Sequence, residues 1–304
     1  MSPRTSELAD IEAIEAIVCR DVGRGTRGLI EATRGELAAA AAALASSRSV
    51  GLITGFYVPR GETPAAETDG PVGTGLLAMA LAACGLKVRI ATDAPCAGVV
   101  RSAVSGIEVD DVDDIGQAIA RWREAGVDCA IAIERCGKSV DGKPRNMRGA
   151  DVSAWTLPLD DLFLGGGWKR LAVGDGGNEI GMGKLPRRLI GETVPNGEAI
   201  ASMTSCDHLV VAGVSNWGAY GLMAALAVLK PEWRDAIAKF LTAERDLTVT
   251  NATVAAGAVD GVTARREPTV MALAPMCTAP WSKSYAALLA ERRRIRRPLW
   301  TLTP

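Results

Sequence analysis

The stretch RLAVGDGGNEIGMGK, residues 170–184, joins a short apolar run to a loop that contains five glycines. The apolar part does not alternate with polar residues, which is typical of a strand buried on both faces of a parallel sheet. Similar apolar runs stand at 50–56, 88–92, 129–133 and 208–212. Helical patterns lie between these runs, so the sequence predicts a three-layer α/β sandwich with a mostly parallel, Rossmann-like sheet.

The helical patterns are clearest at 72–84, 115–125 and 217–229. An Ala-, Glu- and Leu-rich segment at 7–46 predicts one or two further helices, broken at the glycines of 23–25. No internal repeat or low-complexity linker divides the chain. We therefore expect residues 1–304 to form a single α/β domain with helices at its N-terminus.

The composition is that of an ordinary globular protein, with 48% hydrophobic and 23% charged residues. The formal net charge of -1 argues against nucleic acid as a partner, because phosphate binding requires a basic face. The apolar runs are shorter than the ~18–20 residues that a membrane span needs, so we expect no membrane partner. A small-molecule substrate is the expected partner, and Ala-rich helices are compatible with a homo-oligomer.

The cysteine and histidine content limits the kinds of metal and redox site that the chain can form. The seven cysteines are scattered without a CxxC pair, which suits a reducing compartment. The first twenty residues are too acidic for a signal or transit peptide, so a cytoplasmic location is expected. The chain has one histidine, His208, which excludes a multi-histidine zinc site within one chain.

Polar residues that follow the predicted strands are the first candidates for a site, because ligands collect at the carboxyl ends of parallel strands. In the glycine-rich loop, Asp175, Asn178 and Glu179 supply three oxygen donors within five residues. Such donors suit Mg²⁺, Mn²⁺ or Ca²⁺. A glycine turn whose acids merely cap the next helix is the alternative interpretation.

Acidic residues elsewhere extend this pattern. Glu67 and Asp69 stand just before a glycine-flanked helix start, where they could equally act as caps. Glu134 ends an apolar strand, and burying a carboxylate is costly unless it is paired or bound to a metal. The predicted metal ligands are therefore Glu67, Asp69, Glu134, Asp175, Asn178 and Glu179.

Substrate-binding residues are predicted on the same loops. Arg148 could bind a carboxylate in bidentate fashion, although a surface loop with incidental charges is also compatible with this segment. Glycine lets backbone N–H groups approach a ligand closely. The expected substrate contacts are Thr54, Asn146, Arg148, Gly176, Gly177, Ser215 and Asn216.

The segment 173–184 resembles the hallmark motif of the D-glutamate cyclase-like family. Supporting matches occur in family order at 54–56, 67–71, 141–151 and 215–218. The resemblance is to the C-terminal domain of the family's mitochondrial enzyme. It implies a metal-binding lyase of D-amino acid metabolism, which closes D-glutamate to 5-oxo-D-proline with loss of water.

The chemistry of this ring closure predicts a division of roles among these residues. A divalent ion on Glu134, Asp175 and Glu179 would polarise the γ-carboxylate of the substrate. Lys184 would stabilise the developing oxyanion, and Asp69 would accept the ammonium proton. The same residues leave two other functions open: a metal-dependent hydrolase of a phosphorylated metabolite, and a non-catalytic metal- or ligand-binding subunit.

Overall fold

A computed structural model describes residues 4–273, so Cys277 lies outside the described part. Its centre is a parallel sheet with the strand order β5-β4-β1-β6-β7-β8. The strands are β1 (Ser49–Thr54), β4 (Lys87–Thr92), β5 (Glu108–Asp111), β6 (Cys129–Ile133), β7 (Lys169–Gly174) and β8 (His208–Val211). The predicted Rossmann-like α/β architecture is confirmed.

The strand order contains a reversal that matters for function. From β1 the chain moves outward through β4 to β5, and it then returns to the other side of β1 for β6, β7 and β8. Loops leaving β1 and β6 consequently diverge at the carboxyl edge of the sheet. In open α/β sheets this point of reversal is where ligands bind.

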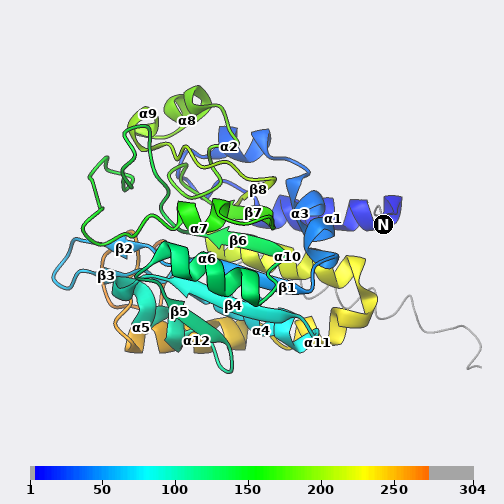
Figure 1. The fold of residues 1–304 in the computed structure, drawn as a ribbon. Helices are drawn as coiled ribbons and strands as arrows, with labels where there is room; N and C mark the ends of the chain where they lie inside the picture. The colour runs from blue at the N-terminus through cyan, green and yellow to red at the C-terminus, as the bar shows by residue number, and fades with distance from the viewer. Residues whose placement is uncertain (1–3, 274–304) are drawn as a thin grey trace, which may run out of the picture.

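Helices cover both faces of the sheet, as Figure 1 shows for α6 and α10 on opposite sides. One buried cluster joins the sheet to α1, α3, α4, α5, α10, α11 and α12, and a second joins it to α2, α6, α7, α8 and α9. The first group spans Thr5–Val18, Glu36–Ala45, Pro71–Ala83, Ala94–Ser102, Ser215–Leu229, Arg234–Ala238 and Ala243–Ala255. The second spans Arg27–Ala32, Ile115–Glu124, Asp160–Leu164, Arg187–Thr193 and Gly197–Ile200. None of the helices in the described range is long and apolar enough to cross a bilayer.

All five predicted strands and the three clearest helices are confirmed, with ends shifted by up to two residues. The edge strand β5 escaped prediction because three of its four residues are acidic. Two of these acids, Glu108 and Asp110, pair with Arg89 of the neighbouring strand. A short antiparallel hairpin of β2 (Tyr57–Val58) and β3 (Ala65–Ala66) was also not predicted.

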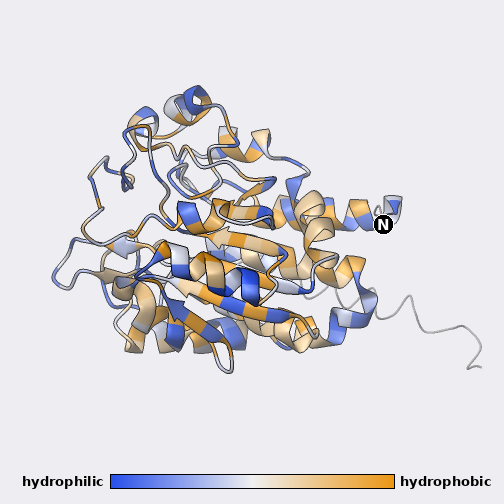
Figure 2. Ribbon diagram, viewed as in Figure 1, coloured by the Kyte–Doolittle hydropathy of each residue, from blue (hydrophilic) through white to orange (hydrophobic). Residues whose placement is uncertain are grey.

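The two faces of the sheet are filled differently, although the central strand β6 consists of apolar residues (Figure 2). Leu52 and Ile131 pack toward α4 and α10, whereas Ala130 and Ala132 face the other cluster. These small residues leave room for Trp122 of α6, which is fully buried. At Gly51 a Cβ atom would lie 2.4 Å from the Trp122 ring, so this strand position requires glycine.

Gly51→Ala is expected to destabilise the protein by about 1–3 kcal/mol, because the added methyl group overpacks the indole of Trp122. Gly98→Ala is the matched control: this helical glycine is exposed and has open space around its Cβ position. It should stabilise the protein by about 0.5–1 kcal/mol through helix propensity. Urea unfolding measures both, and equal stabilities for the two variants would contradict the packing argument.

Candidate metal and substrate site

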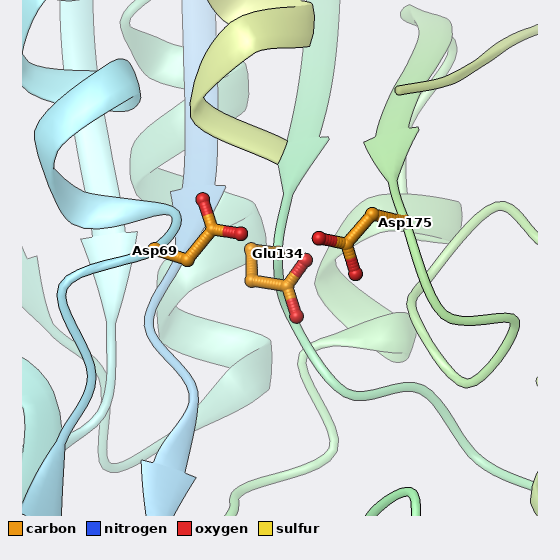
Figure 3. A group of neighbouring side chains, drawn as sticks. All are labelled: Asp69, Glu134 and Asp175. Carbon is orange, nitrogen blue, oxygen red and sulfur yellow. The ribbon is translucent and has the colours of Figure 1, made fainter. Parts of the chain in front are cut away.

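Three buried carboxylates meet at the carboxyl edge of the sheet. Asp69 precedes α4, Glu134 follows β6 and Asp175 follows β7, and Figure 3 shows the three side chains pointing toward one another. One carboxylate oxygen from each lies within 4.8 Å of the others. The cluster, called the acidic triad below, lies where the loops of β1 and β6 diverge.

The first turn of α10 holds the loop that carries Asp69. The backbone N–H of Asn216 donates to one Asp69 oxygen at 2.8 Å, and that of Ser215 donates to the other at 3.1 Å. The amide oxygen of Asn216 accepts from the N–H groups of Gly70 and Gly73 at 2.9 and 2.7 Å. Ser215 and Asn216, expected to contact substrate, therefore orient the triad.

Glu134 is held by local backbone geometry and one hydroxyl. Its φ of 45° lies in the left-handed region, an arrangement that costs about 1–3 kcal/mol in a residue with a Cβ. The Ser215 hydroxyl donates to its carboxylate at 2.5 Å. Gly70, at φ +89°, packs so closely that a Cβ there would lie 2.7 Å from Glu134 Cβ and 2.8 Å from the Thr54 hydroxyl. The Thr54 hydroxyl thus packs against the backbone at Gly70.

The glycine-rich loop wraps around one of its own side chains. Both oxygens of Glu179 are used, accepting from the backbone N–H groups of Asp175, Gly176 and Gly177 at 2.6–2.9 Å. The N–H groups expected to bind substrate are therefore engaged by Glu179. Asn178, an expected metal ligand, donates from its amide to the carbonyl oxygen of Arg145 at 2.7 Å.

Burial and mutual repulsion make these acids hard to ionise. Burial raises the pKa of Glu67, Asp69 and Glu134 well above the ordinary range, and neighbouring carboxylates raise it further. Burial and then the charge of Asp175 also raise the pKa of Glu179. This concentration of buried acids calls for a compensating positive charge.

Arg24 supplies part of that charge and was not predicted from the sequence. Its guanidinium lies 2.5 Å from Asp175, and its side chain is 21% exposed. Burial alone would lower the pKa of Arg24, but Asp175, Glu134 and Glu179 together raise it. Arg24 lies on a turn between α1 and α2, and in the sequence the glycines of this turn predict only a break between helices.

A second arginine fixes the frame around the site. Arg135 is fully buried and forms an ion pair with Asp93, which follows β4. It also donates to the Gly55 carbonyl oxygen at 2.9 Å, just after β1. The carboxyl ends of three adjacent strands are thereby joined by one side chain.

The acidic triad has the donors that a divalent cation needs. Both carboxylate oxygens of Asp175 are buried and accept no hydrogen bond within residues 4–273, their cationic neighbour being Arg24. A buried carboxylate in this condition favours a bound cation. Because all the available ligands are oxygens, the site fits Mg²⁺, Mn²⁺ or Ca²⁺ rather than a sulfur-preferring metal.

A pocket with about 570 Å³ of space, part of it open to solvent, lies beside the triad. Thr54 and Asp69 are not among its lining residues. Its charged and amide-bearing walls come from Glu67, Glu134, Asp175, Asn178, Glu179, Arg24, Arg60, Asn146 and Arg148.

Lys184 lies away from this pocket. Its ammonium group binds Glu36 at 2.6 Å and the carbonyl oxygen of Asp207 at 2.7 Å. Asp207 immediately precedes β8, so Lys184 is at the amino edge of the sheet, opposite the triad. The expectation that Lys184 stabilises an oxyanion has no support in this arrangement. His208 contacts the same Glu36 at 3.1 Å.

Comparison with known proteins places these residues in a family context. A family model described as "D-glutamate cyclase-like, C-terminal" matches residues 14–276. The chain is 33% identical over 242 residues to the human protein "D-glutamate cyclase, mitochondrial". That alignment covers 72% of this chain and 39% of the human protein, so the chain spans well under half of its relative.

Two carboxylates of the site should respond differently to neutralisation. Glu179→Gln leaves a buried backbone N–H without an acceptor and should cost about 1–3 kcal/mol in EDTA. Glu134→Gln, which loses no backbone hydrogen bond, should leave stability in EDTA nearly unchanged, yet it should remove any stabilisation by Mg²⁺ or Mn²⁺. Urea unfolding with and without metal tests both; full metal stabilisation of the Glu134 variant would rule out the triad as the metal site.

Proposed function

Because the chain belongs to the D-glutamate cyclase-like family, we propose that it closes D-glutamate to 5-oxo-D-proline with loss of water, assisted by a divalent cation. The observation that carries this proposal is the buried triad of Asp69, Glu134 and Asp175 beside a pocket lined by arginines. Such a pocket offers separate places for the carboxylates and the ammonium group of an amino dicarboxylate. The reaction is that of a lyase.

The triad would hold the cation, which we expect to be Mg²⁺, Mn²⁺ or Ca²⁺. A divalent ion in this position supplies Lewis-acid polarisation of the γ-carboxylate, which is otherwise a poor electrophile. Asn178 and Glu179 support the loop instead, through their contacts with backbone groups. Hydrogen bonds from Ser215 and Asn216 hold the carboxylates of Asp69 and Glu134 in position.

Arg148 is the residue we assign to the α-carboxylate. It lines the pocket, is exposed, and forms no ion pair with another residue of the described range. Asn146 shapes the turn that presents it, because its side-chain oxygen accepts from the N–H groups of Arg148 and Ala150 at 3.0 and 3.1 Å. Fixing the α-carboxylate limits the rotations open to the substrate and favours ring closure.

Glu67 is better placed than Asp69 to accept the ammonium proton. It lines the pocket outside the triad, whereas Asp69 lies below the pocket with its oxygens on three backbone N–H groups. Removing one proton frees the amine lone pair to form the new C–N bond at the γ-carbon. Two of the three ammonium protons end on the departing oxygen, which leaves as water, so atoms and charges balance.

The contacts of the glycine-rich loop count against a hydrolase of phosphorylated metabolites. Phosphate groups are commonly bound by successive backbone N–H groups of such loops. Here the N–H groups of residues 175–177 are already bonded to Glu179.

An NMR time course of the purified chain with D- or L-glutamate, in EDTA or with Mg²⁺ or Mn²⁺, tests the proposal. We expect 5-oxoproline to appear with metal and from the D-enantiomer. Asp175→Asn should abolish both turnover and metal binding, because it removes a triad carboxylate. Glu67→Gln should reduce turnover at least 100-fold, in line with loss of a general base, while metal binding persists.

Absence of product in every condition would reject the cyclase function for this chain alone. Ligand binding without turnover, followed by turnover on adding a second protein, would instead identify a subunit that needs a partner. Unchanged turnover in Glu67→Gln would overturn the assignment of Glu67 while leaving the cyclase proposal in place.

A further inference from the structure

The pocket carries positive charge at two separate places. Arg60 and Arg148 form one, where burial and then the charge of Arg148 lower the pKa of Arg60. Arg60 is anchored by its bonds to the carbonyl oxygens of Gly261 and Val262 at 2.5 and 2.7 Å. Arg24 forms the other, on the wall that contains Asp175.

The turn that carries Arg24 is well defined. One oxygen of Asp21 accepts from the N–H groups of Gly23, Arg24 and Gly25 at 2.8–3.2 Å. Both glycines have positive φ, at +92° and +76°, which residues with a Cβ rarely adopt. The base of the Arg24 side chain is therefore fixed by its own turn, independently of the triad.

The guanidinium of Arg24 has donors left for a ligand. It has five N–H donors in a planar fork, and within the described part of the chain its one close partner is Asp175. Its side chain is four-fifths buried and lines the pocket, so the remaining donors are available to a carboxylate that enters beside Asp175. A guanidinium fork matches a carboxylate in two-point geometry.

We propose that Arg24 is a specificity-determining residue that binds the γ-carboxylate of the substrate, while Arg148 binds the α-carboxylate. This assignment rests on the proposed function. It follows from placement: the carboxylate that reacts must lie beside the triad, and Arg24 is the arginine in contact with a triad member. Arg24 thus selects amino acids that carry a second carboxylate.

Ligands that lack one carboxylate test this division. D-norvaline keeps the α-carboxylate and ends in a methyl group, 4-aminobutanoate keeps the other carboxylate, and glutarate keeps both without the amine. Arg24→Gln should weaken binding of 4-aminobutanoate and glutarate about 10- to 100-fold, the range for a charged hydrogen bond, and that of D-norvaline less than 2-fold. Arg148→Gln should weaken the binding of D-norvaline and leave the binding of 4-aminobutanoate unchanged.

Dissociation constants would be measured on the full chain by ligand-observed NMR, with Mg²⁺ and with EDTA. Arg27→Gln is the matched control: it lies three residues away, is 80% exposed, and should change no ligand affinity. Arg24→Lys keeps the positive charge but loses the planar set of guanidinium donors. Its affinity for 4-aminobutanoate and glutarate should therefore lie between those of the wild type and Arg24→Gln. The lysine variant also provides a folded comparison if the glutamine variant is unstable.

The outcomes separate this inference from the cyclase proposal. If glutarate binding depends on Arg24 as expected and no 5-oxoproline forms, Arg24 binds the second carboxylate and the cyclase proposal fails. If 5-oxoproline forms but Arg24→Gln weakens D-norvaline as much as glutarate, Arg24 has only a structural role and the inference is overturned. Failure of the wild-type chain to bind any of the three ligands also overturns it.

Discussion

Mutual repulsion among buried carboxylates is the constraint around which this site is organised. One carboxylate oxygen each of Asp69, Glu134 and Asp175 lies within 4.8 Å of the others, and the charges of Glu179 and Glu67 further raise the pKa of Glu134. Each such group loses its hydration on burial and gains unfavourable contacts with the others. A fold that retains them must hold them in place by other interactions.

The chain meets this requirement in two ways. Asp69 and Glu179 each accept three backbone N–H groups, so these two acids are parts of the backbone scaffold. Glu134 and Asp175 receive little such support: one accepts from the Ser215 hydroxyl and the other pairs with Arg24. The carboxylates with weak protein support are those that a cation or substrate can engage.

Sheet topology explains how these residues meet although they are far apart in sequence. The reversal between β1 and β6 opens the carboxyl edge, and α4 and α10 direct their first turns toward it. Asn216 joins those two turns through the N–H groups of Gly70 and Gly73. Arg135 does the same for the ends of β1 and β4.

Much of this arrangement could be predicted from the sequence, because apolar runs mark the central strands and acids after them mark the site. Residue types alone could not tell which acids the backbone would bind: Glu179 was predicted as a ligand, but the φ and ψ angles of its loop turn three N–H groups toward it. Arg24 was missed because its turn follows a helix rather than a strand. Lys184 was assigned to the site because its motif begins there, whereas the chain has returned to the other edge of the sheet by that point.

The distribution of charge in the pocket constrains which ligands it can accept. A simple dicarboxylate would satisfy the arginines but leave Glu67 without a positive partner, and a simple amine would do the reverse. A phosphate ester lacks the ammonium group that the acids favour and finds the loop N–H groups occupied by Glu179. Under the proposed function, an amino dicarboxylate would complement both signs at once, with its ammonium group toward Glu67 and its carboxylates toward Arg24 and Arg148, all three of which line the pocket. The charge pattern is therefore compatible with the amino dicarboxylate that the proposed function names.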